Sequence, residues 1–234
     1  MLSVLLLSVA STARLETGDL IFVQPPLDTG SPLDDAILAT GAATIQWLRY
    51  HGAVVDSNET AVHVAVALRD PDSGELSFVE AVPPAVQTTP ADVFFRAWPE
   101  RTRFYHGGFR NATIRQRQPA AAQLASKQMG RPYANNFGPP PNQFYCSSLV
   151  DWAYRQVTGD EHVLIDDPFT LIFVPHEFWK QYYADMNSTL PANVTGSNPT
   201  LLLHSPHLQY SQIPAHAVHW QSYMAALHPH RHGL

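Results

Sequence analysis

The chain has 234 residues, of which 45% are hydrophobic and 15% are charged, a composition typical of one globular domain with a sizeable core. Its formal net charge is -6, and no basic run could neutralise a phosphate backbone, so we expect no nucleic-acid partner. Beyond the first residues, no segment is apolar over the roughly twenty positions that a membrane-spanning helix needs, so we expect no stable transmembrane segment.

The first thirteen residues, MLSVLLLSVASTA, are apolar and end in small residues. Ser11 and Ala13 stand where a signal peptidase requires small side chains, and the run is too short to span a bilayer. The pattern predicts a signal peptide over residues 1–13 and a mature chain that begins near Arg14. The expected location is therefore secreted or lumenal, or periplasmic or extracellular in a bacterium.

Sequons for N-glycosylation give an independent indication of the secretory pathway. An Asn-x-Ser/Thr pattern occurs at four positions, namely Asn58, Asn111, Asn187 and Asn193. Asn198 does not count, because Pro199 follows it. In a eukaryotic source these asparagines are expected to carry glycans on the surface.

The N-terminal part of the domain predicts a strand and then a helix. Residues 20–24 form a short apolar run bounded by prolines, which is typical of a strand. Ser31 followed by Pro32 is typical of a helix start, and the helix is expected to reach Gly41. The segment 42–60 is either an inserted loop or a continuation of that helix.

A β-hairpin is expected next. Residues 62–68 alternate in size in the manner of a strand, residues 70–74 have strong turn chemistry, and residues 76–82 form the returning strand. Two pairing registers place His63 and Glu80 on the same face, either directly opposite each other or as diagonal neighbours. The intermediate register, shifted by one residue from each of these registers, places His63 and Glu80 on opposite faces.

Two further helices are predicted. The first begins at Pro119 and ends before Gly130. A proline-rich loop over 135–142 then leads to Cys146, which opens an amphipathic helix that Gly159 ends. Cys146 is expected on the buried side of its first turn.

The C-terminal part is predicted to hold little regular structure. Residues 187–200 are expected to form a surface loop and residues 201–203 a last short strand. We expect a single catalytic domain over 14–225 and a disordered, His-rich tail over 226–234.

Cys146 is the only cysteine, so no internal disulfide can form. A lone cysteine can be a small buried hydrophobic residue, but its place at a helix start favours another role. The free N–H groups and the helix dipole stabilise a thiolate there, and the same N–H groups can bind an oxyanion. The sequence therefore predicts that Cys146 is a nucleophile for acyl transfer.

His63 is the predicted base for this nucleophile. Of the twelve histidines, it alone lies within a strand pattern, where a rigid scaffold would hold the ring. Glu80 on the neighbouring strand could orient that ring. In isolation His63 could equally satisfy a hydrogen bond at a sheet edge.

Six motifs together resemble the YiiX-like family of permuted papain-fold amidases and peptidases, relatives of the NlpC-type hydrolases. They are Thr17-Gly-Asp-Leu-Ile-Phe22, Ala36-Ile-Leu-Ala-Thr40, Val62-His-Val-Ala-Val66, Phe78-Val-Glu-Ala81, Gly130-Arg-Pro-Tyr133 and Tyr145-Cys-Ser-Ser-Leu-Val150. The resemblance implies an α+β fold in which an antiparallel sheet packs against helices, with a catalytic triad of Cys146, His63 and Glu80. This sequence differs from the family pattern at Ser148, where members often have Glu, and at Ala134, where they often have Asp.

The expected activity is that of a thiol hydrolase or acyltransferase, acting on an amide or ester bond through a thioester on Cys146, with no cofactor or metal. A small amide, a peptide or a lipid-like ester is the expected substrate. One alternative is a lipid acyltransferase or esterase, and a second is a catalytically inactive binding module.

A third alternative is a metal site. It would use the pair His204 and His207, the pair His216 and His219, or the histidines of the tail.

Overall fold

The computed structural model describes residues 15–27 and 30–214. Six strands form one antiparallel sheet in the order β4-β3-β2-β1-β5-β6. The strands are β1 (Leu20–Gln24), β2 (His63–Arg69), β3 (Leu76–Val82), β4 (Ala85–Pro90), β5 (Arg103–Phe109) and β6 (Leu208–Gln212). The predicted α+β class is confirmed.

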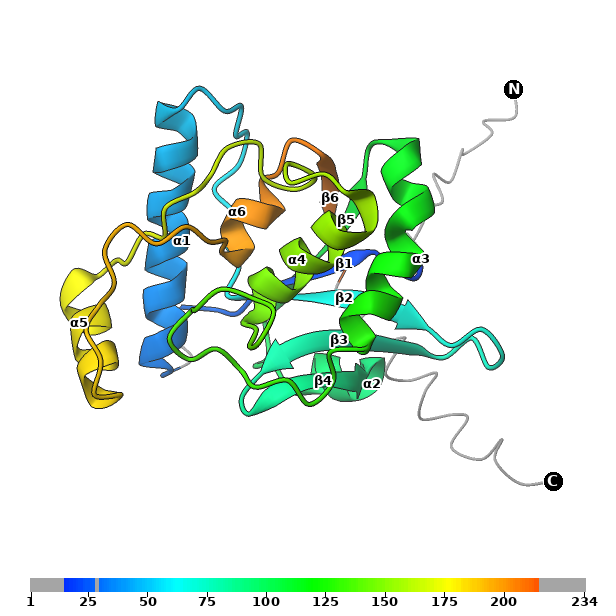
Figure 1. Ribbon diagram of the computed structural model, residues 1–234, viewed down its shortest axis with the longest axis horizontal. Helices are drawn as coiled ribbons and strands as arrows, with labels where there is room; N and C mark the ends of the chain where they lie inside the picture. Colours follow the sequence, from blue (N-terminus) through cyan, green and yellow to red (C-terminus); the bar gives the residue numbers. More distant parts are fainter. Residues whose placement is uncertain (1–14, 28–29, 215–234) are drawn as a thin grey trace, which may run out of the picture.

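Helices cover both faces of the sheet. They are α1 (Pro32–Tyr50), α2 (Ala91–Arg96), α3 (Ala112–Ser126), α4 (Cys146–Thr158), α5 (His176–Asp185) and α6 (Pro199–Leu203). Helices α3 and α4 pack against β2 and β3, whereas α1 and α5 lie to one side of the sheet (Figure 1). Among the described residues, no helix is both long and apolar enough to cross a membrane.

Strand β2 shows how the two faces are filled. Val64 and Val66 belong to the core cluster that includes residues of α3, α4 and α6. Ala65 and Ala67 point the other way, into a cluster with the aromatic residues of α2. The small alanines fit under the large rings of that helix, and this explains the alternation in size seen in the sequence.

The predicted hairpin is present, and β3 has the predicted bounds. Its register pairs Val66 with Val79 and Ala67 with Phe78. Continued along the strands, this register sets Glu80 opposite Ala65 and makes it a diagonal neighbour of His63. It is one of the two registers that keep both side chains on one face.

Helix α1 resolves the segment that the sequence left open. Ser31 is its N-cap, and the Oγ of Ser31 accepts a hydrogen bond of 3.2 Å from the backbone N–H of Asp34. The helix continues through residues 42–50, and the segment from His51 to Val62 returns the chain to the sheet. The helix is therefore longer than the predicted end at Gly41.

The predicted start of the second helix at Pro119 is wrong. Helix α3 begins after Asn111, whose side chain accepts a hydrogen bond of 2.8 Å from Thr113 N, and Pro119 lies inside it. An interior proline costs a helix about 3 kcal/mol. Burial of one face of α3 against the sheet and α4 offsets this cost, and that face consists of Gln118, Ala121, Ala122 and Ala125.

The predicted strand at residues 201–203 is also wrong, because these leucines belong to the short helix α6. Asn198 caps this helix by accepting a hydrogen bond of 2.8 Å from Leu201 N, and Pro199 opens it. All of its residues are buried, between α1 on one side and α4 on the other. The last strand is instead β6.

Three predicted segments lie outside the described residues, wholly or in part. They are the signal peptide over 1–13, the His-rich tail over 226–234, and the end of the domain beyond residue 214.

Candidate active site

The candidate nucleophile is the first residue of α4. Tyr145 is the N-cap, and Gly159 ends the helix with a left-handed backbone (φ 68°) that glycine adopts without strain. Cys146 is 7% exposed and has core neighbours in α3 and β2. Its position at the start of a helix is as predicted.

Ser148 takes part in capping this helix. Its Oγ accepts a hydrogen bond of 3.0 Å from Tyr145 N and donates one of 2.9 Å to Tyr145 O. A side chain at the third helical position that reaches back to the N-cap N–H is half of a capping box, the task that Glu or Gln usually performs. Ser148 therefore caps the helix with a shorter side chain than Glu or Gln would provide.

The hairpin brings the predicted base and its partner together. His63 Nε2 lies 2.7 Å from Glu80 Oε2, and both side chains are buried. Figure 1 shows that β2 begins, β3 ends and α4 begins on the same side of the molecule. His63, Glu80 and Cys146 are far apart in sequence, yet His63 interacts with both of the others.

The carboxylate of Glu80 has further partners on β4. Its Oε1 accepts a hydrogen bond of 2.5 Å from Thr89 Oγ1 and a longer one of 3.4 Å from Gln87 Nε2. Gln87 also donates to Thr89 Oγ1 at 3.0 Å. Our sequence analysis did not identify either residue. The turn at Pro83 and Pro84, followed by a strand-forming run, was the signal that could have placed Gln87 beside Glu80.

Charge at the site favours a protonated imidazole. Burial of His63 acts against its protonation, but hydrogen bonds and charge interactions with Cys146 and Glu80 outweigh it and raise the pKa of His63 to about 10. Burial likewise opposes ionisation of Glu80, yet its bonds to His63, Thr89 and Gln87 keep its pKa below the usual value. The imidazolium is therefore the expected form of His63 at neutral pH.

Aromatic rings cover the imidazole. The ring centroid of His63 lies 5.7 Å from that of Trp98 and 6.2 Å from that of Phe94. Both rings tilt by 35° relative to the imidazole. They limit the rotation of His63 and reduce its contact with water, so the ring stays aligned with Glu80.

A pocket opens beside Cys146, and we call it the apolar pocket. Cys146 and Ser147 form part of its wall, together with Thr40, Tyr133, Tyr145, Ser197 and Asn198. The remaining lining is apolar and comes from α1, α5, α6 and the connecting loops: Ile37, Val62, Phe137, Leu171, Ile172, Phe173, Trp179 and Pro199. Its composition suits an apolar group held next to the nucleophile.

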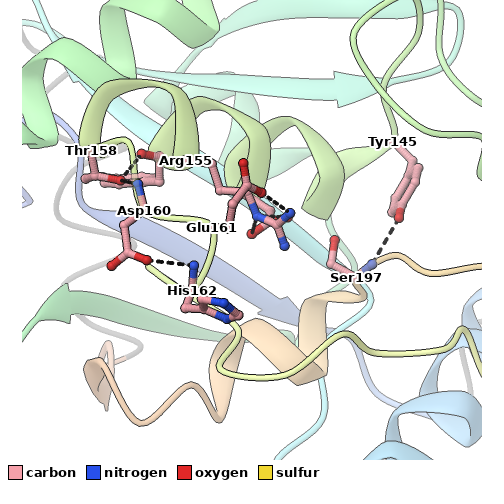
Figure 2. A network of polar contacts seen from close by, with 9 residues as sticks. Tyr145, Arg155, Thr158, Asp160, Glu161, His162 and Ser197 are labelled. Atoms are coloured by element: carbon pink, nitrogen blue, oxygen red, sulfur yellow. Dashed lines mark hydrogen bonds and ion pairs between the residues drawn. The ribbon is translucent and has the colours of Figure 1, made fainter.

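A second pocket shares Tyr145 and Ser197 with the apolar pocket, and we call it the polar pocket because Ser148, Asp151, Arg155 and Glu161 also line it. Arg155 of α4 lies within it, 3.1 Å from Asp151 and 3.0 Å from Glu161 (Figure 2). Burial raises the pKa of Asp151 to about 6, although Arg155 acts in the opposite direction. Tyr145 Oη accepts a hydrogen bond of 3.1 Å from Ser197 N, so the two residues that line both pockets are bonded to each other.

The histidine pair that could have held a metal has other partners. His204 Nε2 is hydrogen-bonded to the Glu59 carbonyl at 2.8 Å, and His207 Nε2 lies 2.7 Å from Asp166 Oδ1. Within residues 15–27 and 30–214, no three His, Cys, Asp or Glu side chains are grouped so that they could hold a metal ion. His216, His219 and the tail histidines lie outside this part of the chain.

Comparisons with known proteins agree with the fold described above. A solved structure described as the metalloprotein yiiX from Escherichia coli O157:H7 has 20% sequence identity, a TM-score of 0.63, and coverage of 84% of this chain and 96% of its own. At this identity the likeness establishes the fold alone. A comparison with the curated proteins found no match.

The model of one family matches residues 14–210, which is most of the chain and includes all the described strands except the end of β6. Its description is permuted papain-like amidase enzyme, YaeF/YiiX, C92 family. In a permuted papain fold the strand with the histidine precedes the helix with the cysteine, as His63 precedes Cys146 here. This chain belongs to the YaeF/YiiX family of permuted papain-like amidases.

Proposed function

We propose that this protein cleaves an amide or ester bond through a thioester on Cys146, with His63 as acid and base and Glu80 as the residue that positions His63. One observation carries the proposal: the buried ring of His63 lies 2.7 Å from Glu80, and its pKa is raised by interaction with both Cys146 and Glu80. A ring held in this way can take the thiol proton and later return it.

The first half of the reaction forms the thioester. Cys146 Sγ attacks the carbonyl carbon, and the bond to the leaving amine or alkoxide breaks. The leaving group receives the proton from His63. Backbone N–H groups in the first turn of α4 have no partners within the helix, so they can bind the oxyanion that develops.

The second half releases the acyl group. Water attacks the thioester carbon, the imidazole of His63 takes one proton from it, and the Cys146 sulfur leaves as the thiolate. The products are a carboxylic acid and the regenerated thiolate–imidazolium pair. A second acceptor such as an alcohol or amine could replace water, in which case the same site transfers the acyl group.

The substrate carries its apolar part on the acyl side. The apolar pocket supports this assignment, because its wall includes the nucleophile and a group bound there lies next to the carbonyl. An amide and an ester of such an acid both fit this proposal.

The test is a comparison of the wild type with Cys146→Ser on activated esters and amides of apolar acids. We expect the wild type to be acylated on Cys146, seen as a mass increase of the intact protein, and the variant to lose turnover but keep its thermal unfolding midpoint. Because Cys146 is the only cysteine, thiol labelling reports on this residue alone. Equal activity of both proteins would contradict the proposal. Absence of acylation in a folded wild type would instead support the inactive binding module.

A further inference from the structure

Ser147 has no structural role that would account for its hydroxyl. It directly follows Cys146 in α4, it is 0% exposed, and it forms part of the wall of the apolar pocket. Its Oγ has no hydrogen-bond partner among the residues that the structure describes. Most buried hydroxyl groups in proteins have such a partner.

The usual local partners of a helical serine are not available here. A serine in a helix commonly bonds the carbonyl four residues earlier, but for Ser147 that residue lies before the helix begins. The capping role at this helix start is taken by Ser148, whose Oγ bonds both backbone groups of Tyr145. The hydroxyl of Ser147 is thus a buried polar group in the wall of an otherwise mostly apolar pocket.

We propose that Ser147 Oγ binds a polar group of the acyl part of the substrate and so determines specificity. This inference rests on the proposed function at Cys146. Successive Cα atoms are only about 3.8 Å apart and both residues line the apolar pocket, so a substrate held there by Cys146 lies near Ser147. We place the polar group on the carbon next to the scissile carbonyl, which is the substrate position nearest to both residues.

The substrate class that follows is an acylated hydrophobic amino acid or a peptide ending in one. Its α-amido group reaches Ser147 Oγ, and its aromatic or branched side chain fills the space lined by Phe137, Leu171 and Trp179. A plain fatty acyl chain would fill the same space but leave the Ser147 hydroxyl buried without a hydrogen-bond partner. A site with such a buried polar group discriminates against a ligand that lacks the matching group.

A pair of p-nitrophenyl esters tests this inference. One is the ester of N-acetylphenylalanine, and the other is the ester of 3-phenylpropanoic acid, which differs only in lacking the α-acetamido group. We expect Ser147→Ala to lower kcat/KM for the first ester by roughly 10-fold to 100-fold and to change kcat/KM for the second by less than about 3-fold. The ratio of the two values within one preparation does not depend on how much of the variant is folded.

A matched control is Ser205→Ala. Ser205 is buried as well, but its Oγ accepts a hydrogen bond of 3.2 Å from His207 N and it does not line the apolar pocket. This variant should keep the wild-type ratio. A third substrate, the p-nitrophenyl ester of decanoic acid, represents the lipid-like class, and wild type should prefer the acetamido ester to it.

Several results would overturn the inference. An unchanged ratio in Ser147→Ala, an equal loss on both phenyl esters, or a preference of the wild type for the decanoyl ester would each do so while leaving the proposed function intact, provided that Cys146 is acylated. If none of the three esters acylates Cys146 in folded protein, the proposed function fails, and the role of Ser147 fails with it.

Discussion

Glu80 and His63 show how a single residue can act only through another. Both Glu80 oxygens are engaged within the sheet, one with His63 and the other with Thr89 and Gln87. Glu80 lines neither the apolar nor the polar pocket. Whatever it contributes to turnover must therefore pass through the imidazole.

This arrangement predicts non-additive losses of activity. His63→Ala should lower kcat/KM by roughly 10² to 10⁴, because proton transfer is lost, and Glu80→Gln should cost less, because an amide oxygen can still accept from the ring. The double variant should be little worse than His63→Ala alone. The measurement is kcat/KM on one activated ester. If the two losses multiply, Glu80 acts independently of His63.

The same pair predicts a dependence of stability on pH. The pKa of His63 is raised to about 10 in the folded protein, so its contribution is complete below about 6.5 and is lost as the pH rises toward 10. The pKa of Glu80 is lowered, so its contribution is complete above about 4.5 and is lost as the pH falls further. Together they stabilise the fold most between about pH 4.5 and 6.5.

Thermal unfolding of the wild type and Glu80→Gln across this range provides the check. The difference in midpoint should be greatest near pH 5 to 6 and should shrink toward pH 10. Glu75→Gln is the control, since Glu75 is an exposed carboxylate at the turn of the same hairpin. A difference that stays constant up to pH 10 would contradict the raised pKa of His63.

At the scale of elements, the beginning of α4 combines a nucleophile with a helix cap. Tyr145 is the N-cap, and Ser148 Oγ is hydrogen-bonded to its backbone N–H and carbonyl. Cys146 provides the thiol, and Ser147 lines the apolar pocket. Successive residues of one turn point in different directions, so each can serve a different neighbour. The helix start therefore fixes the direction of the thiol without using it for capping.

We expect Ser148→Ala to lower the free energy of unfolding by about 0.5–2 kcal/mol, the usual loss when a helix cap is removed. Ser148→Glu should lose less, because its carboxylate can again accept from Tyr145 N. Urea unfolding measures both. Ser126→Ala, which removes a hydroxyl from the last turn of α3, should stay within about 0.5 kcal/mol of the wild type. A similarly small effect of Ser148→Ala would mean that its two hydrogen bonds do not hold the helix start.

At the scale of the whole molecule, the four sequon asparagines are all exposed. A glycan is attached to the Nδ2 atom of asparagine. The side chains of Asn58 and Asn111 each accept a hydrogen bond through Oδ1, from Arg49 and from Thr113 N respectively, so these bonds do not use Nδ2. None of the four lines the apolar pocket. We propose on this basis that the protein passes through a secretory pathway.

Secretion from eukaryotic cells tests this proposal. Enzymatic removal of N-glycans should lower the mass of the secreted protein, and Asn→Gln changes at the four positions should each remove one glycan without loss of ester hydrolysis. Asn198 is an internal control, because Pro199 makes it a poor acceptor and its side chain caps α6. Secreted protein without glycans, or with a glycan at Asn198, would contradict the prediction that the four sequons are glycosylated.

The sequence alone determined the features that depend on local chemistry. It identified the hairpin with Glu80 on the strand next to His63, the helix that opens at Cys146, and the family to which these motifs belong. Periodicity, turn residues and caps are local signals, so they can be recognised in the sequence without knowing the tertiary contacts. The same signals failed at Pro119 and at residues 201–203, where burial against the sheet and between α1 and α4 outweighed local preference.

Only the tertiary structure decided how the site is completed. The register between β2 and β3 determines that Glu80 lies on the same sheet face as His63. Strand β4 places Thr89 and Gln87 beside Glu80, and residues of α1, α5 and α6 line the apolar pocket. These partners are separated from Cys146 by tens of residues, and no local pattern specifies which of them meet. Their contacts arise from burial of apolar surface, which acts without regard to sequence distance, and this is why the unpartnered hydroxyl of Ser147 becomes visible only in the folded chain.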